Sequence, residues 1–223
     1  MDSASVSAGV AVVENSTIKA EYFLNNGLTH SQNLMPMVEF ALNYFDKPDT
    51  IAVTVGPGSF TGVRIAVSCV KGLAMIDEIP CVPVSSMEAL AYNFYGSRYK
   101  GIICALSDAR VQRAYTALFT IGNGKIERLT KDDCLEFAKI DEMLKDYNQD
   151  IYLVGDGAKI FAKSNTKYEK NIVDEKNLLT KASSVAFAAI NKETISSNEL
   201  QAVYLQLPQA QRELNNKLKK RDD

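Results

Sequence analysis

The spacing of apolar positions divides the chain into short strands and longer helices. Runs of about four to eight residues that alternate, or are apolar throughout and end at a turn-forming residue, are typical of strands. Such runs predict a hairpin over 5–24, with its turn at Glu14–Thr17, and strands at 50–56, 80–86, 100–109, 113–122, 124–130 and 150–158. Apolar residues at helical spacing predict helices at 32–45, 59–78, 86–95, 134–147 and 183–191.

The order of these elements repeats, which indicates two lobes built on one plan. Each half begins with strands in a hairpin and continues with a helix, a strand and further helix. We therefore expect an α/β fold whose lobes, each a mixed sheet with helices, cover 1–100 and 101–210, followed by a charged tail at 211–223. The stretch 159–179 carries little apolar pattern and is expected to be an exposed connection.

The helix that follows Gly58 is apolar over more than half of its circumference. One face carries Val63, Ala66, Val67, Val70 and Ala74. A second face carries Ile65, Cys69, Gly72 and Ile76, and the narrow remainder carries Arg64, Ser68, Lys71 and Met75. A surface helix needs an apolar stripe only about 100° wide. One face can pack on the lobe's own sheet; the second is covered either by another layer of the same domain or by another chain.

The helix at 32–45 has the same character. Beside its stripe of Leu34, Val38, Ala41 and Phe45 it carries Met35, Phe40 and Tyr44. Two such helices side by side would offer a partner half of a four-helix bundle, and methionine-rich apolar surfaces adapt well to partners. The residues expected at such an interface are Leu34, Met35, Val38, Ile65, Ser68, Cys69, Lys71, Gly72 and Ile76.

A glycine-rich loop joins a buried strand to the second of these helices. It comprises Gly56, Gly58, Ser59, Phe60, Thr61 and Gly62, with Arg64 just beyond. Backbone N–H groups at a helix N-terminus favour an anion. However, a P-loop has lysine directly after its second glycine, where this chain has Val63, and a dinucleotide loop has a third glycine where this chain has Thr61. A tight turn at the start of the helix is favoured over a phosphate site.

Composition and charge narrow the function classes. The net charge of −2 provides no global field for nucleic acid, and the basic run at 217–221 is interpreted as a solvated tail, with an RNA contact as the alternative. The four cysteines form no C-x-x-C pair, which suits reduced thiols in a cytosol. His30 is the only histidine, which argues against a histidine-based zinc site and against a Ser-His-Asp triad. We expect no membrane span and no signal peptide.

Four stretches resemble the TsaB (YeaZ) family. The most specific is GPGSFTGVRIAVSCVKGLA at 56–74, and the supporting stretches are THSQNLMPMVE at 29–39, LSDARVQRAYTALF at 106–119 and AVYLQLPQA at 202–210. The resemblance covers residues 2 to about 210. It implies the actin-like ATPase (ASKHA, RNase H-like) fold in two lobes, which agrees with the repeated plan.

The resemblance also implies a role. It implies a non-catalytic scaffold subunit that pairs with TsaD and is joined by TsaE, for threonylcarbamoyl transfer to the adenosine beside the anticodon of tRNA. The family pairs through the two helices described above. We accordingly expect TsaD as partner, a homodimer in its absence, contact with tRNA only through the complex, and a cytoplasmic location. No cofactor is expected on the chain alone, with ATP or ADP at the junction of the assembled complex.

The chain departs from the family at its start. The family begins with an apolar strand that leads into Asp-Thr/Ser-Ser, whereas this sequence begins Met1-Asp2-Ser3-Ala4. We expect that the N-terminus is incomplete, because a missing central strand would expose sheet edges.

The alternative function is a stand-alone actin-like ATP-binding enzyme, a kinase or ATPase. Its cleft would carry Asp2, Ser3, Asp108 and Asp156, which sit near predicted strand ends, and we interpret these as a vestigial nucleotide cleft. A salt bridge or turn cap is favoured over a nucleotide contact for Asp108, and a turn is favoured for Asp156. No metal site is expected, and a peptidase, which would have to pair Ser59 with His30, is disfavoured.

Overall fold

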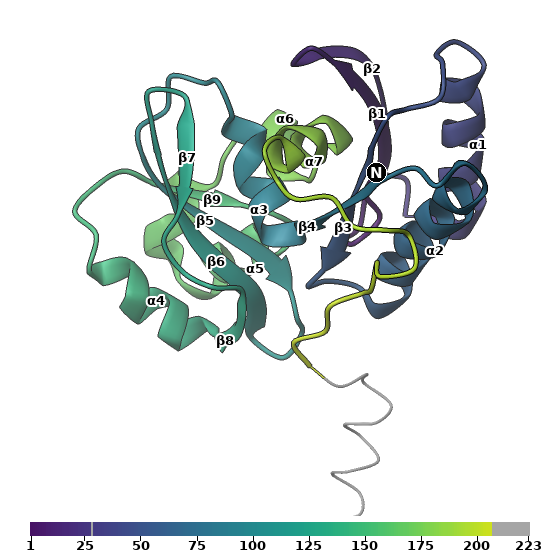
Figure 1. Cartoon of the computed structure of the whole chain (residues 1–223). Coiled ribbons are helices and arrows are strands. Elements are labelled where there is room, and N and C mark those ends of the chain that lie inside the picture. The colour runs from purple at the N-terminus through teal and green to yellow at the C-terminus, as the bar shows by residue number, and fades with distance from the viewer. Residues whose placement is uncertain (28, 207–223) are drawn as a thin grey trace, which may run out of the picture.

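The computed structural model describes residues 1–27 and 29–206 and divides them into two lobes (Figure 1). The strands are β1 Ala8–Glu14, β2 Thr17–Leu24, β3 Ile51–Gly56, β4 Cys81–Ser85, β5 Gly101–Asp108, β6 Arg113–Gly122, β7 Lys125–Arg128, β8 Asp133–Glu136 and β9 Ile151–Val154. The helices are α1 His30–Leu42, α2 Phe60–Asp77, α3 Ser86–Ala91, α4 Phe137–Lys145, α5 Gly157–Ser164, α6 Glu175–Leu178 and α7 Ala182–Ala189, with 3-10 turns at Tyr92–Phe94 and Thr166–Asn171.

The first lobe contains two small sheets and the helices that cover them. β1 and β2 form an antiparallel hairpin whose turn residues Asn15 and Ser16 have positive φ, as the sequence predicts at Glu14–Thr17. β3 and β4 pair in parallel, joined by α2, as in a βαβ unit. α1 packs on β1, α2 packs on β3, and α7 contacts both strands. In Figure 1, α1 and α2 lie side by side at the outer edge of this lobe, and α7 lies toward the centre of the molecule.

The first two residues lie between the two small sheets. Asp2 forms an antiparallel bridge with Gly9 of β1, with N···O distances of 3.0 and 2.9 Å. On the other side, the Thr54 N–H of β3 donates to the carbonyl oxygen of Met1 at 3.2 Å. Met1 and Asp2 therefore connect β1 to β3 through backbone hydrogen bonds.

The second lobe is a five-stranded sheet with β5 at its centre. The order is β7-β6-β5-β9, with β8 also paired to β6. The even-numbered side chains of β5, such as Cys104, pack with α4 and α5, and the odd-numbered ones, such as Ile103, pack with α3. Burial on both faces explains why this strand reads as a continuous apolar run. The hairpin through Asn123–Gly124 forms as predicted.

Two segments differ from expectation. The stretch 159–179, expected to be an exposed connection, contains most of α5, a 3-10 turn and α6, because Phe161, Tyr168 and Leu178 are buried against β5 and β9. The C-terminal part of the expected second lobe also returns to the first one, since α7 packs on the sheets of the first lobe. The charged tail at 211–223 lies outside the described residues.

After α7 the chain runs back across the first lobe. We call residues 195–206 the C-terminal strap. Ile195 bridges to Cys81 of β4, and the Val203 N–H donates to the carbonyl oxygen of Val55 at 2.7 Å. The strap ends at the second lobe, where Gln206 Nε2 lies 2.6 Å from Cys134 Sγ. The strap therefore links both lobes. Within the described residues, no helix has both the length and the apolar character that a membrane span requires.

Candidate functional site

Helices α1 and α2 each bury one apolar face in the core of the first lobe. The buried residues of α1 are Leu34, Met37, Val38 and Ala41, and those of α2 are Gly62, Val63, Ala66, Val67, Val70 and Ala74. The five apolar residues expected on one face of α2 are all among them. The two helices contact each other, so their remaining surfaces adjoin.

That remaining surface is rich in exposed apolar side chains, and we call it the α1–α2 face. Ile76 is 83% exposed, Tyr44 69%, Met75 63%, Phe40 48%, Leu42 44% and Met35 42%. Isolated exposed apolar residues are ordinary, whereas several of them on and beside two neighbouring helices are typical of interaction surfaces. A groove of about 490 Å³ runs between the helices, lined by Met35, Pro36, Val38, Glu39, Leu42, Asn43 and Leu73.

The structure places the expected interface residues unevenly. Met35, Ser68, Gly72 and Ile76 are exposed, and Ile65 and Cys69 are half-buried. Burial raises the pKa of the Cys69 thiol, so Cys69 behaves as an apolar residue here.

Three members of the expected set have other roles. Leu34 is fully buried and Val38 is 5% exposed, so the expectation that they lie at the surface is wrong. Apolar residues occur on both sides of α1, so the sequence does not indicate which side faces β1. The side that carries Leu34 and Val38 faces β1, and only an edge of Val38 reaches the groove. The Lys71 ammonium donates to the carbonyl oxygens of Asn198 and Leu200, at 3.3 and 3.1 Å, and thus holds the C-terminal strap.

Four exposed apolar residues are not among the interface residues expected from the sequence: Phe40, Leu42, Tyr44 and Met75. Phe40 packs edge-on against Tyr22 of β2, with ring centroids 5.3 Å apart, and against Tyr44 at 5.0 Å. The signal was present, since Phe40 and Tyr44 stand four residues apart and share one side of the helix expected at 32–45; α1 itself ends at Leu42.

The glycine-rich loop before α2 is filled by the chain's own N-terminal residues. The Ser59 N–H donates to the carbonyl oxygen of Ala4 at 2.7 Å, and Ser3 Oγ donates to the carbonyl oxygen of Gly62 at 2.8 Å. A Cβ at Gly58 would collide with the Ala4 carbonyl oxygen, and one at Gly62 with the Ser3 carbonyl oxygen. The glycines thus permit a close approach of two backbone segments.

The side chains of the loop also serve the fold. Ser59 is the N-cap of α2, and its Oγ accepts from the Gly62 N–H at 3.2 Å. The Phe60 ring lies between Tyr204 of the strap, 4.8 Å away, and the Arg64 guanidinium, 4.2 Å from the ring centroid. Gly56 passes so close to Val203 that a Cβ would collide with its carbonyl oxygen. Thr61 is exposed.

The four residues assigned to a nucleotide cleft fall into two separate groups. In the first lobe, Asp2 Oδ1 accepts from Thr54 Oγ1 at 2.6 Å and from the Ala4 N–H at 3.2 Å, and Asp2 Oδ2 is buried without a partner. Burial raises the pKa of Asp2, against the opposing effect of these hydrogen bonds. The Ser3 hydroxyl donates to the carbonyl oxygen of Gly62, as described above.

In the second lobe, Asp108 and Asp156 lie together at the ends of β5 and β9. Asp156 Oδ1 accepts from the Asp108 N–H at 3.2 Å, and Asp108 Oδ1 accepts from the Arg110 N–H at 2.8 Å. Burial raises the pKa of Asp156, against hydrogen bonds from Asp108 and Ser107. The Asp108 carboxylate thus closes a local turn, and the Asp156 carboxylate joins the segment after β9 to the end of β5.

The metal-binding side chains are dispersed. Over 1–27 and 29–206, no three His, Cys, Asp or Glu side chains are grouped so that they could hold a metal ion. His30 Nε2 lies 2.8 Å from the carbonyl oxygen of Ser5, and Cys69, Cys81 and Cys104 are free thiols.

Comparisons with known proteins point to one family. A family model described as "TsaD: tRNA N6-adenosine threonylcarbamoyltransferase" matches residues 26–220. The "tRNA threonylcarbamoyladenosine biosynthesis protein TsaB" of Bacillus subtilis (strain 168) is 32% identical over 222 residues, which is 95% of this chain and 94% of the relative. The protein of the same name from Haemophilus influenzae is 25% identical over 197 residues, 79% of this chain and 80% of the relative.

Solved structures give the fold. The structure titled "YeaZ from Pseudomonas aeruginosa" superposes with a TM-score of 0.70 at 24% identity, over 92% of this chain and 97% of that one. A second, titled as an uncharacterized protein with similarity to peptidase YEAZ from Pseudomonas aeruginosa, superposes with a TM-score of 0.74 and the same coverage. Together with the family model, they confirm the actin-like, RNase H-like α/β fold expected from the sequence.

Proposed function

The chain belongs to the TsaB (YeaZ) family, and from that premise we propose that it is a non-catalytic scaffold subunit in the biosynthesis of threonylcarbamoyladenosine in tRNA. In this proposal the chain pairs with TsaD through the α1–α2 face and TsaE joins the pair. TsaD transfers the threonylcarbamoyl group to the adenosine beside the anticodon. The name shared by the curated relatives supports the pathway.

The observation that carries the pairing is the open α1–α2 face. Its exposed residues come from the two helices that also form the core of the lobe, so the surface is rigid and already in place. A partner that contributes two helices would bury the groove and the residues around Ile76 and complete a four-helix arrangement. Without TsaD, a second copy of the chain would bury the same surface in an isologous dimer.

The glycine-rich loop and Asp2 support a non-catalytic role. A nucleotide at this loop would need its backbone N–H groups and a carboxylate free to act. Here Ser3 and Ala4 occupy the loop, and the Asp2 carboxylate is buried against Thr54. We therefore place ATP or ADP, where one binds at all, at the junction with the partner. The free thiols of Cys69, Cys81 and Cys104 fit a cytoplasmic location.

Substitutions on the α1–α2 face test the pairing. Ile76→Asp and Gly72→Arg should each weaken binding to TsaD at least about 30-fold, because they place a charge in an apolar interface. Both positions are exposed, so the free energy of unfolding should change by less than about 1 kcal/mol. Ile160→Asp, at a 45% exposed position on α5, is the matched control and should bind normally.

Light scattering of the mixed chains and calorimetric titration measure this binding. If both variants bind TsaD as tightly as the unaltered chain, the α1–α2 face is not the pairing surface. Titration of Mg-ATP into the chain alone and into the pair then tests the nucleotide position: heat from the chain alone would favour the stand-alone enzyme.

A further inference from the structure

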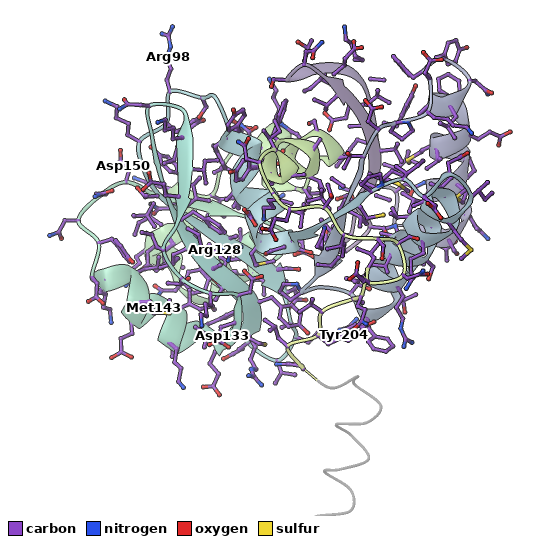
Figure 2. All side chains as sticks on the ribbon, viewed as in Figure 1. Arg98, Arg128, Asp133, Met143, Asp150 and Tyr204 are labelled. Atoms are coloured by element: carbon purple, nitrogen blue, oxygen red, sulfur yellow. The ribbon has the colours of Figure 1, made fainter. Side chains whose placement is uncertain are left out.

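A second concave surface lies on the other lobe, away from the α1–α2 face. It is a groove of about 650 Å³ between the segment 95–100, which links the lobes, and the turn 123–125 that joins β6 to β7. Figure 2 shows Arg98, one of its lining residues, extending outward from the second lobe, on the side of the molecule opposite α1 and α2 in Figure 1.

Two glycines hold the walls of this groove together. Gly96 and Gly124 have φ of 72° and 75°, in the left-handed region that favours glycine. The Gly96 N–H donates to the carbonyl oxygen of Gly124 at 3.1 Å, and a Cβ on Gly124 would lie only 3.3 Å from the Gly96 Cα. The groove is therefore built by backbone contacts that do not depend on mobile side chains.

The groove gathers positive charge. Arg98, Lys100 and Lys125 line it and are exposed, whereas no aspartate or glutamate is among its lining residues. Among the ion pairs of the described residues, none includes these three cations, whereas Arg128 and Lys192 are paired with Glu88. Three like charges around one concavity repel one another, and a bound polyanion would relieve that repulsion.

We propose that this groove binds phosphates of an RNA backbone. The inference rests on the proposed function, which supplies tRNA as the RNA. Its lining offers Ser97 and Asn123 as neutral hydrogen-bond donors beside the cations, and this is the usual set of side chains that contacts nucleic-acid phosphates.

An acidic protein surface fits the groove less well. Protein interfaces need an apolar anchor, and the aromatic residue at this site, Tyr95, already stacks on Tyr92 and Phe187, with ring centroids 5.7 and 5.3 Å apart. Because the groove and the α1–α2 face are lined by different lobes, TsaD bound at the α1–α2 face would leave the groove open. The chain would then touch tRNA directly, in contrast to the indirect contact expected from the family resemblance.

The test compares two triple variants of the full chain that change the net charge equally. One combines Arg98→Glu, Lys100→Glu and Lys125→Glu; the control combines Lys139→Glu, Lys163→Glu and Lys170→Glu, which are exposed cations of the same lobe. The probe is an unmodified, fluorescently labelled tRNA transcript at about 50 mM salt, titrated with the isolated chain, so that the result does not depend on pairing with TsaD.

The groove variant should weaken binding at least 10-fold, and the control by less than about 3-fold. The slope of log K against log salt should fall by about 2–3 for the groove variant only, as expected for the loss of three phosphate contacts. Milder changes to glutamine at the three groove positions should act in the same direction, which separates charge loss from misfolding.

Equal weakening in both triple variants, or none in the groove variant, would overturn the proposal. So would displacement of the tRNA by polyglutamate at equal charge concentration, because the site would then recognise acidic chains in general. Binding of the groove variant to TsaD, measured in parallel, should be unchanged. If the groove variant loses binding to TsaD but not to tRNA, that result concerns the pairing proposal and not the groove.

Discussion

Helix α2 carries a glycine near each end, and the two lie in opposite surroundings. At the first turn, Gly62 is buried, and its carbonyl oxygen accepts a hydrogen bond from Ser3. Ten residues further along, Gly72 is exposed, and a Cβ placed on it would meet no atom within 4 Å. Beyond it, Met75 and Ile76 are 63% and 83% exposed.

The difference separates two reasons for a glycine to stand in a helix. Gly62 allows another backbone segment to approach, so it serves the fold of this chain. No contact within the chain requires Gly72, and glycine weakens a helix interior. In the proposed pairing, the missing side chain would permit a close approach of a partner helix. We therefore call the end of α2 at Gly62 its structural end and the end at Gly72 its interface end.

The largest expected effect is at the structural end. Gly62→Ala should lower the free energy of unfolding by about 2–3 kcal/mol, because the new methyl group collides with the Ser3 carbonyl oxygen and backbone must move. Urea denaturation followed by circular dichroism measures the change. A loss below about 0.5 kcal/mol would mean that Ser3 and Ala4 do not occupy the loop in solution.

A smaller, pH-dependent effect is expected at Asp2, which packs beside the same turn. Burial raises its pKa above the ordinary value of 3.8, so the folded chain binds the proton more tightly than the unfolded chain. Asp2 therefore favours folding most below about pH 3.8, and this contribution is lost as the pH rises through the raised folded-state pKa. Asn at this position keeps an oxygen that can accept from Thr54 and does not titrate.

The free energy of unfolding of the unaltered chain minus that of Asp2→Asn should accordingly fall from pH 4 to pH 7. Denaturation curves at several pH values give this difference. Asp77→Asn, at the other end of α2, removes only an exposed ion pair with Lys47 at 2.8 Å and should change stability by less than about 0.5 kcal/mol at pH 7. If this difference instead rises with pH, burial does not raise the pKa of Asp2 in the folded chain.

The buried face of α2 could be predicted from the sequence, whereas the residues that surround the helix could not. Helical periodicity separated the buried stripe through Val70 from the stripe that ends at Ile76, because that pattern is local. It could not say what fills the glycine-rich loop, since Ser3 and Ala4 come from a distant part of the chain.

The same limit explains the errors on α1 and in the second lobe. Both sides of α1 are apolar, and only the position of β1 decides that Leu34 faces inward while Phe40 faces outward. The return of α7 to the first lobe and the path of the C-terminal strap are likewise long-range contacts that no local pattern encodes. The groove at Arg98 was missed because its two walls are separate turns that meet only in the folded chain.

The smallest expected effect has the opposite sign and comes from the interface end. Gly72→Ala should raise the free energy of unfolding by about 0.5–1 kcal/mol, because alanine is the better helix former and its methyl group points into open space. The same methyl group should weaken pairing with TsaD several-fold, if Gly72 lies where the partner's backbone approaches. Denaturation of the isolated chain and titration with TsaD measure the two effects separately. A variant that gains stability and pairs normally would show that the glycine is not needed for close approach, even if Ile76 belongs to the interface. A variant that loses stability would show that the open space beside Gly72 is filled by the chain itself, and the contrast between the two ends of α2 would then be lost.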